Sequence, residues 1–198
     1  LGVSAALLFG LVWTGAPVAL GFAVLIVWAV SAWDDWIGAS PAVRLLVHAL
    51  AAASIVLTWE PLPSSILVIF AALSLIWGLN LFNFMDGSDG LAASTAVIGG
   101  VALATLAWLA PETPSSQMIM GVCIVVAASA AGLLCYNLPP AEIFMGDGGS
   151  TVLGLTLAAM CLEGAVTGLW SLAAAAALFM PFWADATYTL LRRLAGGH

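Results

Sequence analysis

Aspartates in short glycine-containing or paired segments are the residues of this sequence best suited to chemistry. Asp86 and Asp89 lie in "NFMDGSDG", Asp147 lies in "MGDGGST", and Asp34 and Asp35 are adjacent in "WDDWIG". Carboxylates that gather at one place repel one another unless a cation lies among them. Magnesium favours one or two carboxylates together with the phosphate oxygens of a substrate. The aspartates therefore predict a divalent-cation site, and solvated loop residues or helix caps are the alternative.

Two glycines follow Asp147 where an apolar helix is expected to begin. Backbone amides at such a helix start approach a phosphate closely, and the helix N-terminus adds partial positive charge. The alternative is an ordinary N-cap, in which Asp147 accepts hydrogen bonds from the first turn. We take Gly148 as a candidate substrate-binding position.

Amide and basic side chains lie near these aspartates in the sequence. Asn80 and Asn83 are three residues apart, so they share one face of a helix and are placed to orient a substrate or a carboxylate. Arg44 is a candidate to bind a phosphate or to pair with an aspartate. His48 lies one turn beyond Arg44, and we interpret it as a hydrogen-bonded packing residue outside the catalytic set. Asn137 is a further candidate polar group.

The elements that carry these residues are predicted to be membrane helices. Of 198 residues, 64% are hydrophobic, and the mean hydropathy is +1.17. Apolar runs long enough to cross the hydrocarbon of a bilayer recur along the chain. We predict an all-α polytopic transmembrane helix bundle with about eight spans, near residues 1–13, 16–33, 42–59, 64–80, 90–109, 116–136, 149–163 and 165–183.

The connections between these spans predict which side of the membrane carries the aspartates. Consecutive spans alternate in direction, so the segments with the aspartate motifs all emerge on one side, which also receives Asp185 and all three arginines. The positive-inside rule makes that side cytoplasmic. The other side is expected to receive Glu60, Glu112 and Glu163.

Four segments together resemble the polyprenyl-phosphate N-acetylhexosamine-1-phosphate transferases. They are "DDWIG", "NLFNFMDGSDGLA", "NLPPAEIFMGDGGS" and "DATYTLLRRL", in the family's order from about residue 20 to the end. Trp36 stands where the muramoyl-pentapeptide branch commonly has a third acid. Together with "FNFMDGSDG" and "PPAEIFMGD", this is more similar to the branch that initiates lipopolysaccharide and O-antigen. Members usually continue past the last segment, so we expect residues 1–198 to be one transmembrane domain truncated at both ends.

The resemblance assigns a role to each matching position. It implies catalytic roles for Asp34, Asp35, Asp86 and Asp89, substrate binding by Asn80, Asn83, Asn137 and Arg44, and magnesium binding by Asp147 and Asp35. We add Gly148 to the substrate-binding set because of its place at the helix start.

The activity implied by the resemblance is transfer of an N-acetylhexosamine 1-phosphate from a UDP-sugar to undecaprenyl phosphate in the bacterial inner membrane, with release of UMP. Mg²⁺ is the expected cofactor, with Mn²⁺ as an alternative. The expected partners are UDP-N-acetylhexosamine, undecaprenyl phosphate and membrane lipids, with no nucleic acid and with a homodimer left open. The alternatives are a phospho-N-acetylmuramoyl-pentapeptide transferase, a cation-coupled membrane transporter and a remnant without turnover.

Overall fold

The computed structural model describes residues 2–59 and 64–196, and all regular secondary structure within these ranges is helical. The predicted all-α fold is confirmed. Glu60 lies outside the described residues. The helices are α1 (Gly2–Trp13), α2 (Val18–Ile37), α3 (Pro41–Val56), α4 (Ser65–Met85), α5 (Leu91–Leu109), α6 (Pro114–Asn137), α7 (Asp147–Val166), α8 (Leu172–Ala177) and α9 (Met180–Gly196).

Local capping signals determine where several helices begin. The side chain of Ser40 accepts a hydrogen bond from the Val43 amide, and Pro41 occupies the first helical position of α3. Thr113 and Ser116 form a capping box at the start of α6, where Pro114 again follows the cap. These side chains satisfy amides that lack a partner in the first turn, so each helix has a sharply defined start.

Within the described ranges, five helices (α2, α4, α5, α6 and α7) are long and apolar enough to cross a membrane, and α1 and α3 are apolar but shorter. The chain is a multi-pass membrane protein. The predicted span over 165–183 is wrong, because α7 ends at Val166 and α8 has only six residues. Between them the chain turns back, and the indole Nε1 of Trp170 donates to the carbonyl of Cys161 at 2.9 Å. The alanine-rich composition gave no sign of this break.

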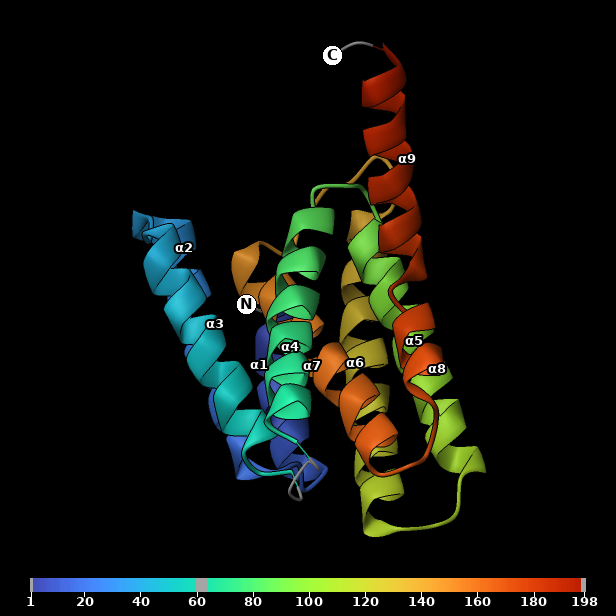
Figure 1. Ribbon diagram of the computed structural model, residues 1–198. Coiled ribbons are helices and arrows are strands. Elements are labelled where there is room, and N and C mark those ends of the chain that lie inside the picture. Colours follow the sequence, from blue (N-terminus) through green and yellow to red (C-terminus); the bar gives the residue numbers. More distant parts are fainter. Residues whose placement is uncertain (1, 60–63, 197–198) are drawn as a thin grey trace.

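Helix α7 is the central element of the bundle. It crosses the middle of the molecule at a slant between α2 and α4, and it also contacts α1, α5 and α6 (Figure 1). Nearly all of its residues are buried, polar ones included. A helix that is buried on all sides is held in place by its neighbours. The first turn of α7 is therefore positioned by packing along its whole length.

Gly154 lets α7 and α4 approach closely. A Cβ at this position would lie 2.6 Å from the Cβ of Phe82, 2.8 Å from the Cα of Leu79 and 3.0 Å from the carbonyl oxygen of Gly78. Two of these three contacts are with backbone atoms, which cannot move away as a flexible side chain does. Small residues allow such close contacts between membrane helices.

We expect Gly154→Ala to destabilise the protein by about 1–3 kcal/mol, because the added methyl group overpacks the contact between α4 and α7. The measurement is the thermal unfolding midpoint in detergent. Gly132→Ala is the matched control, since Gly132 lies in a helix and its Cβ would have no neighbour within 4 Å. Equal midpoints for the two variants would contradict the prediction.

Candidate active site

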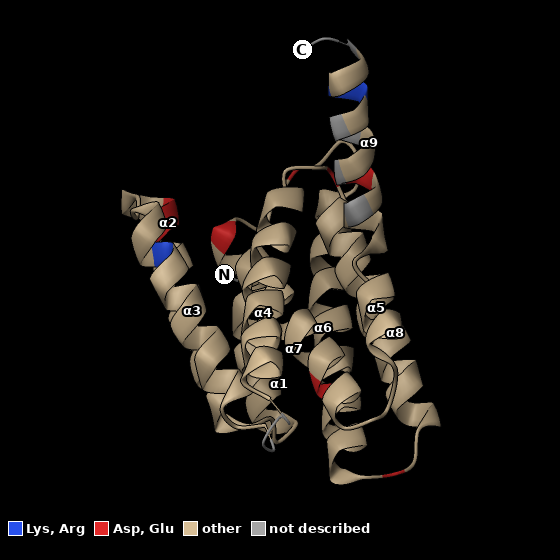
Figure 2. Cartoon of the chain, viewed as in Figure 1, with Lys and Arg blue, Asp and Glu red and all other residues tan. Residues whose placement is uncertain are grey.

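Most of the described acidic residues lie toward one end of the bundle, which we call the acidic end (Figure 2). Asp34 and Asp35 lie in the last turn of α2, and Asp147 is the first residue of α7. Asp86 is the C-cap residue of α4, and Asp89 follows in the turn before α5. Five aspartates from three separate stretches of the chain therefore lie at the acidic end, as the alternation of helix directions predicted.

Arg44 on α3 pairs with two of these aspartates. Its Nη1 donates to Oδ2 of Asp34 at 2.6 Å and to Oδ2 of Asp147 at 3.3 Å. The other oxygen of Asp34 accepts the amide of Ala39 at 2.6 Å. Both oxygens of Asp34 are thus occupied, whereas Asp147 shares the arginine through a longer contact. Of the two predicted roles for Arg44, the structure shows the pairing with aspartate.

Asp35 lies across the start of α7. Its two oxygens accept the amides of Asp147 and Gly148 at 3.3 and 3.4 Å. Gly146, just before the helix, has φ of +67°, and a Cβ there would lie 3.2 Å from Oδ2 of Asp35. A side chain at position 146 would be strained in this conformation and would crowd the carboxylate. The glycine therefore keeps the helix start open to an anion, which here is Asp35 itself.

The polar side chains of the first turn of α7 are held by neighbouring helices. Ser150 donates to Oδ1 of Asn83 at 2.7 Å, which connects α7 to α4. Ser31 on α2 shares a hydrogen bond of 3.0 Å with Thr151. Ser4 on α1 donates to the carbonyl of Gly148 at 2.8 Å.

These three serines and Thr151 were not among the site residues predicted from the sequence. Ser150 and Thr151 could have been found from their places next to Asp147 in "MGDGGST". Ser4 and Ser31 lie in apolar runs without any motif, so nothing in the sequence connected them with the site.

Asp86 is buried, with 7% of its surface exposed. Its Oδ1 has no hydrogen-bond partner among the residues that the structure describes. Burial, and to a lesser degree the negative charge of Asp147, raise the pKa of Asp86 to about 6, against a hydrogen bond from the backbone of Gly146 that lowers it. A buried carboxylate oxygen without a partner is costly, so Asp86 is the side chain here that most needs a ligand or a proton.

The raised pKa of Asp86 predicts a pH-dependent stability in the metal-free protein. The unfolded chain releases this proton near pH 3.8, whereas the folded state holds it up to about pH 6. The free energy of unfolding therefore falls as the pH rises between these values, and above pH 6 it has been lowered by the full amount. Asp86→Asn removes the ionisable group, so the midpoint difference between variant and wild type should widen from pH 4 to 6 and then stay constant.

The measurement is the thermal midpoint in EDTA at several pH values. Glu112→Gln, which changes an exposed acid away from the acidic end, should follow the wild-type pH dependence. A difference that does not change with pH would refute the assignment of this pKa to Asp86.

Asp89 and Asn137 hold the loops of the acidic end together. Asn137 is buried, accepts the amide of Gly90 at 3.2 Å and donates to the carbonyl of Ile143 at 2.8 Å. Oδ2 of Asp89 accepts the amide of Ala141 at 3.0 Å. Both side chains thus connect the α4–α5 turn to the α6–α7 connection, and these contacts are structural ones.

The described residues contain no group of three or more histidine, cysteine or acidic side chains that could hold a metal ion by themselves. Asp35 and Asp147 still lie next to each other, and Oδ1 of Asp86 needs a partner. Two carboxylates fit magnesium, which takes its remaining ligands from water and substrate phosphate. The donor set is therefore compatible with magnesium bound together with a substrate.

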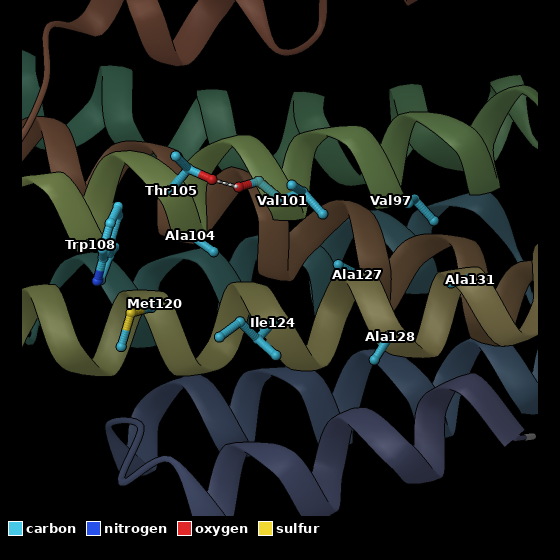
Figure 3. Close-up of a pocket in the computed structure, with 10 residues that line it drawn as sticks. All are labelled: Val97, Val101, Ala104, Thr105, Trp108, Met120, Ile124, Ala127, Ala128 and Ala131. Carbon is cyan, nitrogen blue, oxygen red and sulfur yellow. Dashed lines mark hydrogen bonds between the residues drawn. The ribbon is translucent and has the colours of Figure 1, made fainter.

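A groove between α5 and α6 has a volume of about 510 Å³ and lies apart from the aspartates (Figure 3). Its lining is apolar except for the hydroxyl of Thr105, which donates to the carbonyl of Val101 at 2.8 Å, and the indole N–H of Trp108. Neither group is an acid, a base or a metal ligand. This groove offers no chemistry of its own.

Comparison with known proteins connects this geometry to a family. A family model described as Glycosyl transferase family 4 matches residues 17–165. A phospho-N-acetylmuramoyl-pentapeptide-transferase of Thermosynechococcus vestitus is 31% identical over 199 residues, covering 84% of this chain and 50% of the relative. A probable undecaprenyl-phosphate N-acetylglucosaminyl 1-phosphate transferase of Bacillus subtilis is 39% identical over 118 residues, covering 58% of this chain and 32% of the relative.

The matched region includes the aspartates of α2, the turn after α4 and the start of α7. The chain spans about half the length, or less, of these curated relatives. The family match covers most of the chain and confirms the resemblance of the first three motif segments, whereas "DATYTLLRRL" lies beyond the matched residues. The chain belongs to glycosyl transferase family 4.

Proposed function

We propose that the full-length protein transfers an N-acetylhexosamine 1-phosphate from a UDP-sugar to undecaprenyl phosphate. An oxygen of the acceptor phosphate attacks the β-phosphorus, the bond to the bridging oxygen breaks, and UMP leaves with the electron pair. The observation that carries the proposal is the start of α7, where Asp147, Asp35 and Arg44 meet. The name of the Bacillus subtilis relative supports the same chemistry.

The start of α7 is the proposed site for the diphosphate. The amides of Asp147 and Gly148 donate to Asp35 only at 3.3 and 3.4 Å, which is long for bonds to a charged acceptor. A phosphate oxygen can replace this carboxylate at the helix N-terminus, where the partial positive charge favours an anion. Both oxygens of Asp35 would then be released, one to bind magnesium and the other to accept a proton from the lipid phosphate. This step demands little, because the second pKa of a phosphate is near 6.

We propose that Asp147 and Asp35 hold magnesium together with the diphosphate. When bound, the ion would supply positive charge between two anionic substrates and an acidic site. Arg44 already compensates Asp34 and part of Asp147, so the protein itself supplies one positive charge at this point. Positioning and charge compensation are the main needs of phosphoryl transfer. A covalent aspartyl intermediate is the competing scheme.

An apolar groove beside Asn80 is proposed to hold the isoprenoid chain of the acceptor. Its volume is about 700 Å³, and it lies between α4, α7 and α8. Apolar side chains line most of it, and Asn80 is the lining residue of α4 nearest to Asp86, so it lies where the groove meets the acidic end. A lipid lying in this groove would have its phosphate near the acidic end. The groove gives the acceptor an approach from within the membrane.

The acidic end is proposed to face the cytoplasm from the inner membrane, because Arg44 lies there and Arg192 and Arg193 follow on α9, which extends past that end (Figure 1). The transporter alternative requires paired acids near the middle of the membrane. The structure instead places the paired acids at the ends of helices. This placement favours the enzyme.

The test is UMP release by the full-length protein with undecaprenyl phosphate and either UDP-N-acetylglucosamine or UDP-N-acetylmuramoyl-pentapeptide. The second donor is included because the Thermosynechococcus relative carries the corresponding name. One donor should give UMP with Mg²⁺ and none in EDTA, and Mn²⁺ is tested in parallel. Absence of UMP with both donors would overturn the proposed function.

A further inference from the structure

A side-chain contact of His48 connects α3 to α4. His48 is 5% exposed, and its Nδ1 lies 3.4 Å from Nδ2 of Asn80. Nδ2 of Asn80 also donates to the carbonyl of Ile76 in its own helix at 2.7 Å. The bond to Ile76 fixes which end of the amide is the nitrogen, because a carbonyl accepts only from a donor.

The nature of the contact follows from this orientation. An amide nitrogen can only donate, so Nδ1 of His48 is the acceptor and the imidazole is neutral with its proton on Nε2. The two N–H bonds of Asn80 are then both used. Its Oδ1 receives no hydrogen bond from any residue that the structure describes. Asn80 is exposed and presents this oxygen as an acceptor.

The contact also joins the two polar faces that border the site. Arg44 lies one turn before His48 on the same face of α3, and Asn83 lies one turn after Asn80 on α4. Arg44 reaches Asp147, and Asn83 accepts from Ser150, so both helices contact the first turn of α7. The contact between His48 and Asn80 thus joins α3 to α4 beside that turn.

We propose that His48 is a positioning residue: it fixes the amide of Asn80 so that Oδ1 accepts a hydrogen bond from an N–H or O–H group of the donor sugar. The inference rests on the proposed function. His48 does not touch the reacting atoms and acts only through Asn80. A packing role alone requires bulk at position 48, whereas positioning requires an acceptor atom at the place of Nδ1.

The experiment compares His48→Leu with His48→Asn in the full-length protein. Leucine removes the acceptor, and asparagine retains one near the position of Nδ1. His48→Leu should raise KM for the UDP-sugar about 5- to 10-fold with kcat changed less than about threefold, the size expected for one hydrogen bond, and His48→Asn should restore most of the loss. Ile55→Ala removes buried bulk from the same helix and should lower the thermal midpoint without changing KM.

A double-mutant cycle with Asn80→Ala tests whether His48 acts through Asn80. If it does, His48→Leu adds nothing to the KM of Asn80→Ala. The proposal is overturned if the KM effects of the two single variants multiply in the double variant. It is also overturned if His48→Asn does not restore KM, or if His48→Leu folds and keeps the wild-type KM.

A nitrogen NMR spectrum tests the contact without turnover. In the full-length protein, His48 should be neutral with its proton on Nε2, and its Nδ1 resonance should shift in Asn80→Ala. A wild type that releases no UMP refutes the proposed function, whereas an active wild type with an unshifted Nδ1 in Asn80→Ala refutes only the role of His48.

Discussion

Asp147→Asn is expected to lower UMP release by the full-length protein by a factor on the order of 10³. The amide has the size of the carboxylate, and the N-cap of α7 is Gly146 rather than Asp147, so the helix start should keep its shape. What is lost is one negative charge at the point where Arg44, the amides bonded to Asp35 and the diphosphate are proposed to meet. The effect should fall on kcat, because the charge is needed where the diphosphate reacts.

The measurement is kcat at saturating donor and at increasing Mg²⁺. Glu142→Gln is the control, since Glu142 is an exposed acid on the connection before α7 and its loss changes the net charge equally. The control should keep wild-type kcat. An Asp147→Asn variant with kcat close to that of the wild type would show that the carboxylate at the start of α7 does not take part in the reaction.

The ends of most helices, and the gathering of aspartates at one end, followed from the sequence. Charges are excluded from the middle of a membrane helix, so Asp34, Asp35 and Asp147 could only lie near helix ends. The alternation of helix directions then placed these ends together. Neither step needed any knowledge of how the helices pack.

The order of helices in space did not follow from the sequence. Lipid and the protein interior are both apolar, so a helix buried in the bundle and a helix that faces lipid have similarly apolar sequences. Nothing in the sequence therefore identified α7 as the central helix. Gly154 illustrates this point. It is one of 20 glycines, and only the packing of α4 against α7 shows that a side chain there would meet backbone.

The local chemistry of the site was predicted only in part. Arg44 was expected to bind a phosphate or an aspartate, and the structure shows it on Asp34 and Asp147. The contacts of Asn137 and Asp89 with loop backbone depend on the path of the α6–α7 connection, which hydropathy does not determine. A motif identifies polar residues, but only the fold shows which backbone groups they satisfy.

Arg44→Gln is expected to lower kcat by about 100-fold and to lower the Mg²⁺ concentration needed for half-maximal rate. The loss in kcat is the size of effect seen when one charged donor is removed from a site of this kind. The change in Mg²⁺ dependence has a different cause. Without the guanidinium, Asp34 and Asp147 keep their negative charge uncompensated, and a divalent cation is attracted more strongly.

Arg44→Lys separates the charge from its placement. Lysine keeps one positive charge but has a shorter reach and no planar fork, so it should restore the wild-type Mg²⁺ dependence better than it restores kcat. Both variants are measured by UMP release across a Mg²⁺ series. A glutamine variant that needs more Mg²⁺ than the wild type would show that Arg44 supports metal binding, and the electrostatic account of this cluster would be wrong.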